Sequence, residues 1–295
     1  MSLPPTATLA ELAQKRHAMG LDQPILTQYL IWLGDALHGD FGQSVALRRN
    51  AGPLVLAALP ATIELALCAM AVATLLGLGG GLLLFHLRGT WLEAVGDLGA
   101  TLMMSMPDFL WALLLLLAFG VLLPVLPFMG RLGPGFATPG TGFLLAGALA
   151  TGRLSLFASA LRHMILPASA LGIAFAPPVA RVLRSSLLDV YHEDYIRQAR
   201  LRGQPERRIL LHHALKNAIL PTLALMGVQF GFLFGGTLLV EVIYGYPGIG
   251  NLMVDAVRNA DLPVIQTVGL CYCAVVLLIG MTVDGLHLAL DPRAR

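Results

Sequence analysis

The sequence predicts an all-α protein, a polytopic bundle of transmembrane helices. Hydrophobic residues make up 57% of its 295 residues and charged residues only 12%. Soluble domains typically carry about 25% charged residues. The mean hydropathy is +0.76, and the apolar residues gather in runs long enough to cross the roughly 30 Å hydrocarbon core of a bilayer as helices. These observations together indicate a membrane protein.

Five apolar runs are long enough to span a bilayer, since about 20 residues suffice. These runs are Thr62–Phe85, Leu98–Leu123, Met164–Leu183, Ala218–Val240 and Val264–Ala289. A sixth run, Gly142–Leu161, is interrupted by Gly152 and Arg153. Because an unpaired Arg at the bilayer centre costs at least about 2.5 kcal/mol, we expect this run not to span.

The basic residues predict the orientation of these spans. The segment between the third and fourth spans, Arg181–Lys216, is rich in Arg, which favours the cytoplasmic side. Five spans then place the C-terminus in the cytoplasm and residues 1–53 outside, ahead of a transmembrane domain at 54–295. Residues 1–50 show no signal peptide to carry them across the membrane. We therefore expect a further helix to be missing ahead of them.

The segment Asp189–Pro221 is far more polar than its surroundings, and its pattern predicts a folded loop. Tyr191 to Arg200 suits a short helix, and Gly203 can supply the left-handed residue that ends one. Pro205 is typical of the first turn of a following helix. The sequence therefore predicts a helix, a glycine turn and a second helix.

This loop carries a family resemblance. Tyr195–Gly203, His213–Ala218 and Pro221 resemble the cytoplasmic signature loop of binding-protein-dependent ABC importer permeases, in the form found in the dipeptide, oligopeptide and nickel group. Further landmarks of that group follow in the right order along nearly the whole chain. They are Gly20–Pro24, Gln28–Leu33, Gly39–Gly42, Pro60–Leu65, Ser105–Pro107, Glu241, Pro247–Gly250 and Asp291–Arg293.

The chain departs from the group's pattern in two places. The acidic residue of the general signature is replaced around Arg197–Gln198, as is common in the peptide-type subgroup. Permeases of this group also usually begin with a transmembrane helix before the Gly20 region, and this sequence has none there. The second departure agrees with the topology argument from the basic residues.

The resemblance implies that the loop at about residues 184–217 forms a coupling helix seated on a separate ATPase subunit. The residues it assigns to coupling are Tyr195, Ala199, Arg200, Gly203, Glu206, His213, Asn217 and Pro221. The alternative for any single arginine here is a topology determinant or a lipid headgroup contact. The sequence contains no Gly-x-x-x-x-Gly-Lys-Ser/Thr stretch, so we expect no nucleotide site or other cofactor in this chain, and ATP and Mg²⁺ to be bound by the ATPase subunits.

Ionisable residues at membrane depth are costly and often face a solute path or a partner. Glu64, Asp108 and Asp284 are therefore candidates for the translocation path, with a structural hydrogen bond or an interfacial position as the alternative. The resemblance places a second group at the periplasmic mouth, where anchoring of aromatic residues at the headgroups is the alternative. This group is Glu241, Tyr246, Pro247, Gly248 and Gly250.

Together these features predict an inner-membrane permease subunit that imports short peptides by alternating access. The partners implied are a second permease chain, like or unlike this one, two ATPase subunits, a periplasmic solute-binding protein and membrane lipid. A net charge of only +2 without a basic face argues against nucleic acid. We expect no catalytic residues, and no metal site, because His192, His212 and His213 lack a further ligand at fixed spacing.

Three alternatives stay open. The same machinery can serve nickel or another small solute, because selectivity in such systems rests largely on the binding protein. A secondary transporter would show inverted repeats with broken helices meeting at the midplane, and no such symmetry is visible. An intramembrane enzyme would need a nucleophile with its base, or a metal motif, within a span.

Overall fold

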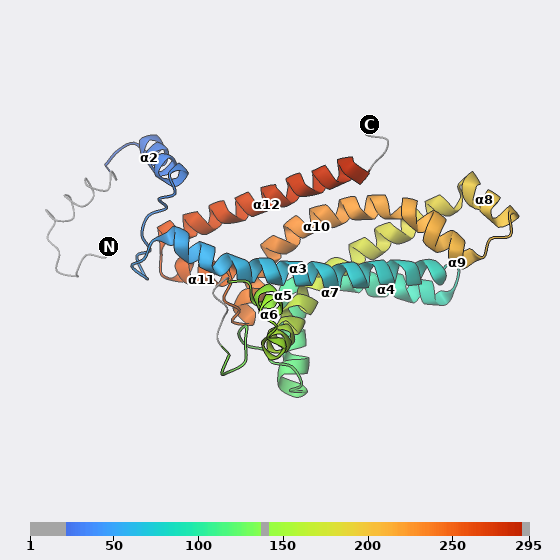
Figure 1. Ribbon diagram of the computed structural model, residues 1–295, viewed down its shortest axis with the longest axis horizontal. Helices are drawn as coiled ribbons and strands as arrows, with labels where there is room; N and C mark the ends of the chain where they lie inside the picture. The colour runs from blue at the N-terminus through green and yellow to red at the C-terminus, as the bar shows by residue number, and fades with distance from the viewer. Residues whose placement is uncertain (1–21, 137–141, 291–295) are drawn as a thin grey trace.

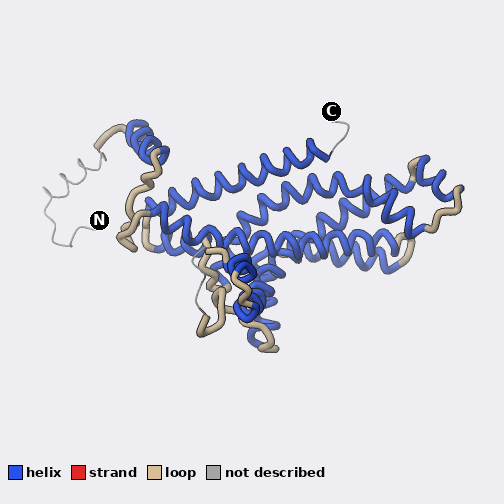
Figure 2. Tube along the Cα trace, in the orientation of Figure 1, coloured by secondary structure: helices blue, strands red, loops and turns tan. Residues whose placement is uncertain are grey.

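The computed structural model describes residues 22–136 and 142–290. Within these ranges the chain is helical and forms no strand, as Figure 2 shows, although an isolated antiparallel bridge joins Gln43 to Asn50. This confirms the all-α prediction. The elements are α2 (Ile25–Leu37), α3 (Ala51–His86), α4 (Trp91–Ser105), α5 (Asp108–Leu115), the π-helix η1 (Leu116–Leu122), α6 (Leu144–Ala150), α7 (Leu154–Tyr191), α8 (Asp194–Leu201), α9 (Glu206–Arg208), the π-helix η2 (Ile209–Ala214), α10 (Leu215–Ile243), α11 (Ile249–Arg258) and α12 (Leu262–Leu290).

The long helices α3, α7, α10 and α12 run lengthwise through the molecule (Figure 1). Helices α8 and α9 lie at one end, α11 lies toward the other, and α2 lies beyond the α11 end. Four stretches are long and apolar enough to cross a membrane: Ala51–His86, Leu154–Tyr191, Glu206–Ile243 and Leu262–Gly285. The first three contain the predicted first, third and fourth spans, and α12 (Leu262–Leu290) contains the predicted fifth, so these four are confirmed as helices.

The predicted second span, Leu98–Leu123, is wrong as a single straight helix. Helix α4 ends at Ser105, and the segment formed by α5 and η1 leaves it at an angle of 100°. The cause is Pro107, whose ring disfavours helical backbone at the residue before it. Met106 accordingly takes the extended conformation, with φ −98° and ψ 128°. The pair forms either one broken span or a re-entrant segment.

The sixth apolar run, Gly142–Leu161, divides between two helices. Its first half forms α6, which has 7 residues and is too short to span, as the sequence predicts. Its second half is not a separate segment, because α7 already begins at Leu154 and continues for 38 residues. The positive φ of 65° at Gly152 produces the turn between them. The expected start of the third span at Met164 was therefore too late.

Close packing of α3 on α7 forms the centre of the bundle. A Cβ on Gly77 would lie 2.6 Å from the Cβ of Val179, and a Cβ on Gly81 would lie 2.8 Å from the carbonyl oxygen of Ala180. Small residues at such contacts let two transmembrane helices approach until their backbones nearly touch. This contact fixes the level of α7 along α3.

The segment that precedes α3 is tied to the far end of the chain. Ser44 Oγ donates to Asp261 Oδ2 (2.5 Å), and the N–H of Ala46 donates to the same oxygen (3.2 Å). Asp261 lies between α11 and α12 and is buried. By contrast, α2 has no buried residue. The loop before α3 is therefore anchored to the bundle, whereas α2 buries none of its residues.

Candidate functional site

The polar segment between α7 and α10 is a folded helix–turn–helix, as its sequence predicts. Helix α8 starts at Asp194, slightly later than the predicted Tyr191, which is the last residue of α7. Gly203 has φ +73°, and a Cβ there would meet nothing within 4 Å. Glycine is therefore favoured at this turn by backbone conformation and not by lack of space. Pro205 precedes α9 in extended conformation and so begins the next helix.

The inner face of this loop packs against the ends of three long helices. Ile196 and Ala199 of α8 are buried there, with relative exposures of 0% and 7%. The buried cluster consists of Phe85, Leu183, Leu187, Ile196, Ala199, Ile209, Ala214 and Ala218. Because α3, α7 and α10 all contribute, displacement of α8 would disturb all three helices.

The outer face of the loop carries most of the residues assigned to coupling. Tyr195, Arg200, Gly203, Glu206, Asn217 and Pro221 are exposed, and His213 is half-buried. Three contacts brace this face: Arg200 Nε donates to Glu206 Oε1 (2.7 Å), Asn217 Nδ2 donates to Tyr195 Oη (2.7 Å), and His213 Nε2 lies 2.9 Å from Gln204 Oε1. The loop is therefore braced by its own contacts, and seven of the eight assigned residues are exposed or half-buried, whereas Ala199 is buried.

Sequence reasoning missed Leu201, the last residue of α8. Its side chain is 81% exposed, beside the charged face of the loop. A single exposed Leu is ordinary on a protein surface. Its position between Arg200 and the turn at Gly203 nevertheless makes it the most prominent apolar group on the tip of the loop.

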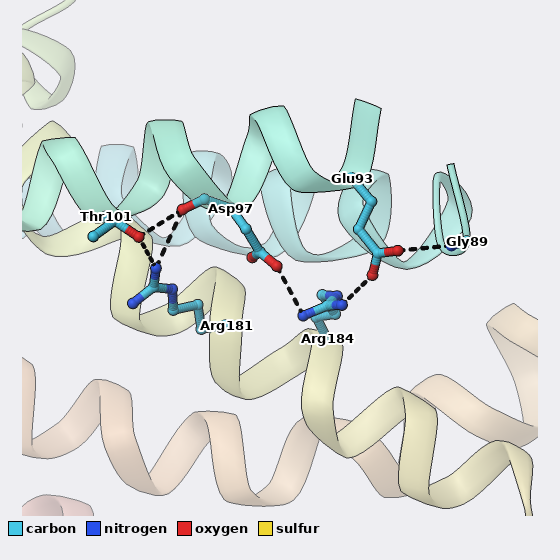
Figure 3. A network of polar contacts seen from close by, with 6 residues as sticks. All are labelled: Gly89, Glu93, Asp97, Thr101, Arg181 and Arg184. Carbon is cyan, nitrogen blue, oxygen red and sulfur yellow. Dashed lines mark hydrogen bonds and ion pairs between the residues drawn. The ribbon is translucent and has the colours of Figure 1, made fainter. Parts of the chain in front are cut away.

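A second polar group joins α4 to α7 (Figure 3), toward the end of the bundle where α8 and α9 lie (Figure 1). Arg184 of α7 forms ion pairs with Glu93 and with Asp97 Oδ2, the latter at 3.2 Å. Arg181, one turn earlier, donates to the main-chain oxygen of Asp97 (3.2 Å) and to Thr101 Oγ1. The spacing of the three α4 residues, four apart, puts them on one helix face.

At the α11 end, the centre of the polar contacts is Glu241. Its side chain is completely buried, where it accepts hydrogen bonds from Thr62 Oγ1 (2.6 Å) and from the N–H groups of Gly250 (2.8 Å) and Asn251 (3.1 Å). Thr62 Oγ1 in turn accepts from the N–H of Ile249 (2.9 Å). The carboxylate thus lies at the N-terminus of α11, where the helix dipole and unpaired N–H groups stabilise an anion.

The other residues assigned to the mouth surround this carboxylate or lie near it. A Cβ on Gly248 would lie 2.3 Å from Glu241 Oε2, so only glycine fits beside it. Tyr246 is fully buried and Pro247 is exposed. Tyr244 is also buried, and its hydroxyl donates to the carbonyl of Ala112 (2.9 Å). These two tyrosines are therefore packed inside the chain and do not reach lipid headgroups.

The three candidates for the translocation path lie in separate surroundings. Glu64 is ion-paired with Arg131 (2.6 Å) and accepts from the N–H of Leu145 (2.8 Å), so its charge has a structural partner. Asp108 is half-buried at the start of α5, and its Oδ2 faces Gly236 of α10. Asp284 is exposed on α12. The structure does not bring these carboxylates together.

The family model of the binding-protein-dependent transport system inner membrane component matches residues 73–295. The chain belongs to this family. The resemblance inferred from Tyr195–Gly203 is thereby confirmed, and the chain is a multi-pass inner-membrane permease of the ABC importer type.

Similar proteins cover almost the whole permease. The di/tripeptide transport system permease protein DppB of Pseudomonas aeruginosa is 38% identical over 285 residues, which cover 96% of this chain and 84% of that one. The dipeptide permease DppB of Escherichia coli is 36% identical over 96% of this chain and 86% of its own length. The glutathione permease GsiC of Salmonella typhimurium is 35% identical over 99% of this chain and 86% of its own.

Solved structures confirm the fold of the permease. An inward-facing MetNI methionine ABC transporter matches with a TM-score of 0.62 and 16% identity, over 81% of this chain and 96% of that chain. An amino acid ABC transporter matches with a TM-score of 0.54 and 17% identity, over 80% and 93%. At these identities the likeness concerns the helical architecture alone.

Sequence reasoning missed the partners of the permease's arginines. Arg181 and Arg184 were predicted as topology determinants or loop residues, and Arg131 was not singled out. Their carboxylate and hydroxyl partners are 67 to 91 residues away along the chain. The spacing of Glu93, Asp97 and Thr101 on one helix face was the available signal.

In the described part of the chain, no three His, Cys, Asp or Glu side chains are arranged to hold a metal ion.

Proposed function

We propose that this permease imports short peptides, together with a second permease chain, two ATPase subunits and a solute-binding protein. It hydrolyses no ATP itself. Relatives at 35–38% identity, named as dipeptide, di/tripeptide and glutathione permeases, support the peptide class. The single observation that carries the mechanism is the loop of α8, α9 and η2, which is folded without a partner chain, exposed on its outer face and packed on its inner face against three long helices.

In this proposal the ATPase subunit binds the outer face of the loop, and its closure moves α8 as a rigid body. Because α8 shares a buried cluster with α3, α7 and α10, the motion reaches the ends of the spans together. Alternating access then follows from rotation of packed helices and not from local bending. The α8 end lies in the cytoplasm with the C-terminus, and the α11 end lies at the periplasmic side.

The first experiment measures ATP hydrolysis by the complete transporter in lipid nanodiscs, with its binding protein, with and without dipeptides. We expect stimulation that needs both the binding protein and the peptide. Stimulation by nickel or another solute in place of peptides would keep the mechanism and overturn the substrate class. Failure of the permease to assemble with an ATPase subunit would overturn the proposal as a whole.

Leu201 tests the docking surface without altering the fold of the loop. Leu201→Asp places a charge on a side chain that is 81% exposed, so the permease should insert and fold normally. We expect the variant to lose ATPase subunits during purification, whereas Leu201→Met should retain them. Normal assembly and uptake by Leu201→Asp would show that this tip does not contact the ATPase.

The orientation can be measured by cysteine labelling. After replacement of Cys68, Cys271 and Cys273 by Ser, a single Cys is introduced at Arg207 on the exposed outer face of the loop. A membrane-impermeant maleimide should label it in inverted vesicles and not in right-side-out vesicles. A Cys introduced at Pro247, exposed at the α11 end, should show the reverse pattern. Labelling of both from the same side would contradict the topology.

A further inference from the structure

In the polar group between α4 and α7, one of the two α7 arginines pairs with both carboxylates and the other pairs with neither. Both carboxylates, Glu93 and Asp97, are paired with Arg184. Among the described residues, Arg181 forms no ion pair; its guanidinium contacts the carbonyl oxygen of Asp97, Thr101 Oγ1 and Met104 Sδ (3.4 Å). Figure 3 shows the two arginines side by side on α7, with only Arg184 directed at the carboxylates.

The group as a whole also has an excess of positive charge. Arg88 adjoins Gly89, whose N–H donates to Glu93 Oε2 (2.6 Å). Three arginines therefore gather around two carboxylates at this end of α4. Among the described residues neither Arg88 nor Arg181 forms an ion pair. The guanidinium of Arg88 lies over the Phe85 ring, whereas Arg181 is half-buried beside the exposed Thr101 and Met104. An added anion would meet an accessible guanidinium.

The position of Arg181 makes its lack of an anion costly. Its neighbour Ala180 packs against Gly81, inside the apolar run of α3 and before the end of that helix at His86. An arginine at membrane depth normally pairs with an acidic group or faces a water-filled path. The hydroxyls of Thr101 and Ser105 donate to carbonyl oxygens one turn back (2.8 and 2.9 Å), so they require no water. The guanidinium of Arg181, in contrast, has only neutral partners, namely a thioether, a carbonyl oxygen and a hydroxyl.

We propose that Arg181 binds the terminal carboxylate of the peptide as it passes through the permease. A guanidinium presents parallel N–H donors that match a carboxylate, which a Lys ammonium does not. The neighbouring Met103 and Met104 are flexible and polarisable, and such side chains adapt to varied peptide residues. This inference rests on the proposed function, because it requires a substrate with a free carboxylate.

The position of Asp108 limits what Arg181 can do. Asp108 faces Gly236, and a Cβ there would also approach Leu171 of α7. Leu171 precedes Arg181 by ten residues, which is about 15 Å along a helix. An extended dipeptide spans about 7 Å. The two charges therefore do not hold both ends of one dipeptide together, and the inference concerns the carboxylate at Arg181 alone.

The test measures equilibrium binding of a radiolabelled dipeptide to the transporter in nanodiscs, without the binding protein and without nucleotide. Arg181→Gln should weaken binding about 10- to 100-fold, which is the range for a lost hydrogen bond to a charged group. Arg181→Lys should be intermediate. Arg162→Gln, which removes an exposed arginine near the other end of α7, is the matched control and should bind normally.

The decisive comparison uses a dipeptide with an amidated C-terminus. Amidation should weaken binding to the wild-type transporter by a similar factor and should cost nothing further in Arg181→Gln, because both changes remove the same interaction. Additive losses, or no saturable binding to the wild type, would overturn the role of Arg181. A dipeptide affinity that changes with the anionic lipid content of the nanodisc and not with amidation would assign the guanidinium to a headgroup. Peptide-stimulated ATP hydrolysis tests the proposed function separately.

Discussion

The two ends of the permease handle their polar residues in opposite ways. On the outer face of the loop of α8, α9 and η2, at the α8 end, the side chains face outward and bind neighbours close in sequence, as Arg200 does with Glu206, 6 residues away. At the α11 end the polar groups are buried and their partners are distant, as Thr62 and Glu241 are, 179 residues apart. The first end has the features of a surface kept available for a partner. The second has the features of a joint that holds the bundle together.

Removal of the Glu241 carboxylate should have the largest effect. Glu241→Ala leaves two buried donors, on Thr62 and Gly250, and the part-buried N–H of Asn251 without an acceptor. At about 1 kcal/mol or more for each, we expect a loss of at least about 3 kcal/mol. Thermal unfolding of the purified permease, followed by size-exclusion chromatography after heating, measures this loss.

Glu241→Gln is the matched variant for that prediction. Its amide oxygen can still accept, so it should lose clearly less stability than Glu241→Ala. Equal losses for the two variants would mean that the volume of the side chain matters and the hydrogen bonds do not. If both Glu241 variants were as stable as the wild type, the buried polar groups at the α11 end would not stabilise the bundle, and the two ends would not differ in this respect.

A glycine at each end gives the next comparison. Gly248→Ala places a Cβ 2.3 Å from Glu241 Oε2, and such overpacking costs about 1–3 kcal/mol. In Gly203→Ala the added Cβ meets no atom within 4 Å. The only cost is the strain of alanine at a φ of +73°, roughly 1 kcal/mol. We expect the first variant to unfold at lower temperature and the second to remain folded.

Transport should distinguish two glycines that have similar backbone conformations, Gly203 and Gly152. Because Gly203 shapes the proposed docking surface, Gly203→Val should uncouple ATP hydrolysis from uptake in a permease that still inserts. Gly152→Val is its control, since Gly152 has φ +65° and equally open surroundings in the turn before α7. Coupled uptake by Gly203→Val, or its loss in both variants, would show that the turn at Gly203 has no special role.

The difference between the ends also explains what the sequence could predict. The helix, turn and helix around Gly203 follow from local signals, namely the glycine, Pro205 and a polar run between apolar ones. The bend in the second span could not be predicted, because the apolar run continues through Pro107. Hydropathy alone does not reveal that the chain changes direction there. Partners such as Thr62 for Glu241, or Arg131 for Glu64, depend on the tertiary fold and have no local signal.

The Arg200–Glu206 ion pair should contribute little to stability, although it is well formed. Their side chains are 42% and 60% exposed, and exposed pairs contribute about 1 kcal/mol or less. Glu206→Ala should therefore leave thermal unfolding nearly unchanged, in contrast to Glu241→Ala at the opposite end. A large loss of stability in Glu206→Ala would mean that the docking face also holds the bundle together.

The smallest expected effect concerns pH and the loop anchored by Asp261. Burial raises the pKa of this carboxyl, but the hydrogen bonds from Ser44 and from backbone N–H groups, including that of Ala46, outweigh it and lower the pKa below its ordinary value. A lowered pKa in the folded state contributes stability above the ordinary value of about 3.9, and that contribution is lost as the pH falls through the lowered value. Thermal unfolding should therefore show an acid-dependent decrease that is smaller in Ser44→Ala, because the variant starts with less of this stabilisation. An identical pH profile in the two proteins would mean that the anchor does not depend on the charge of Asp261.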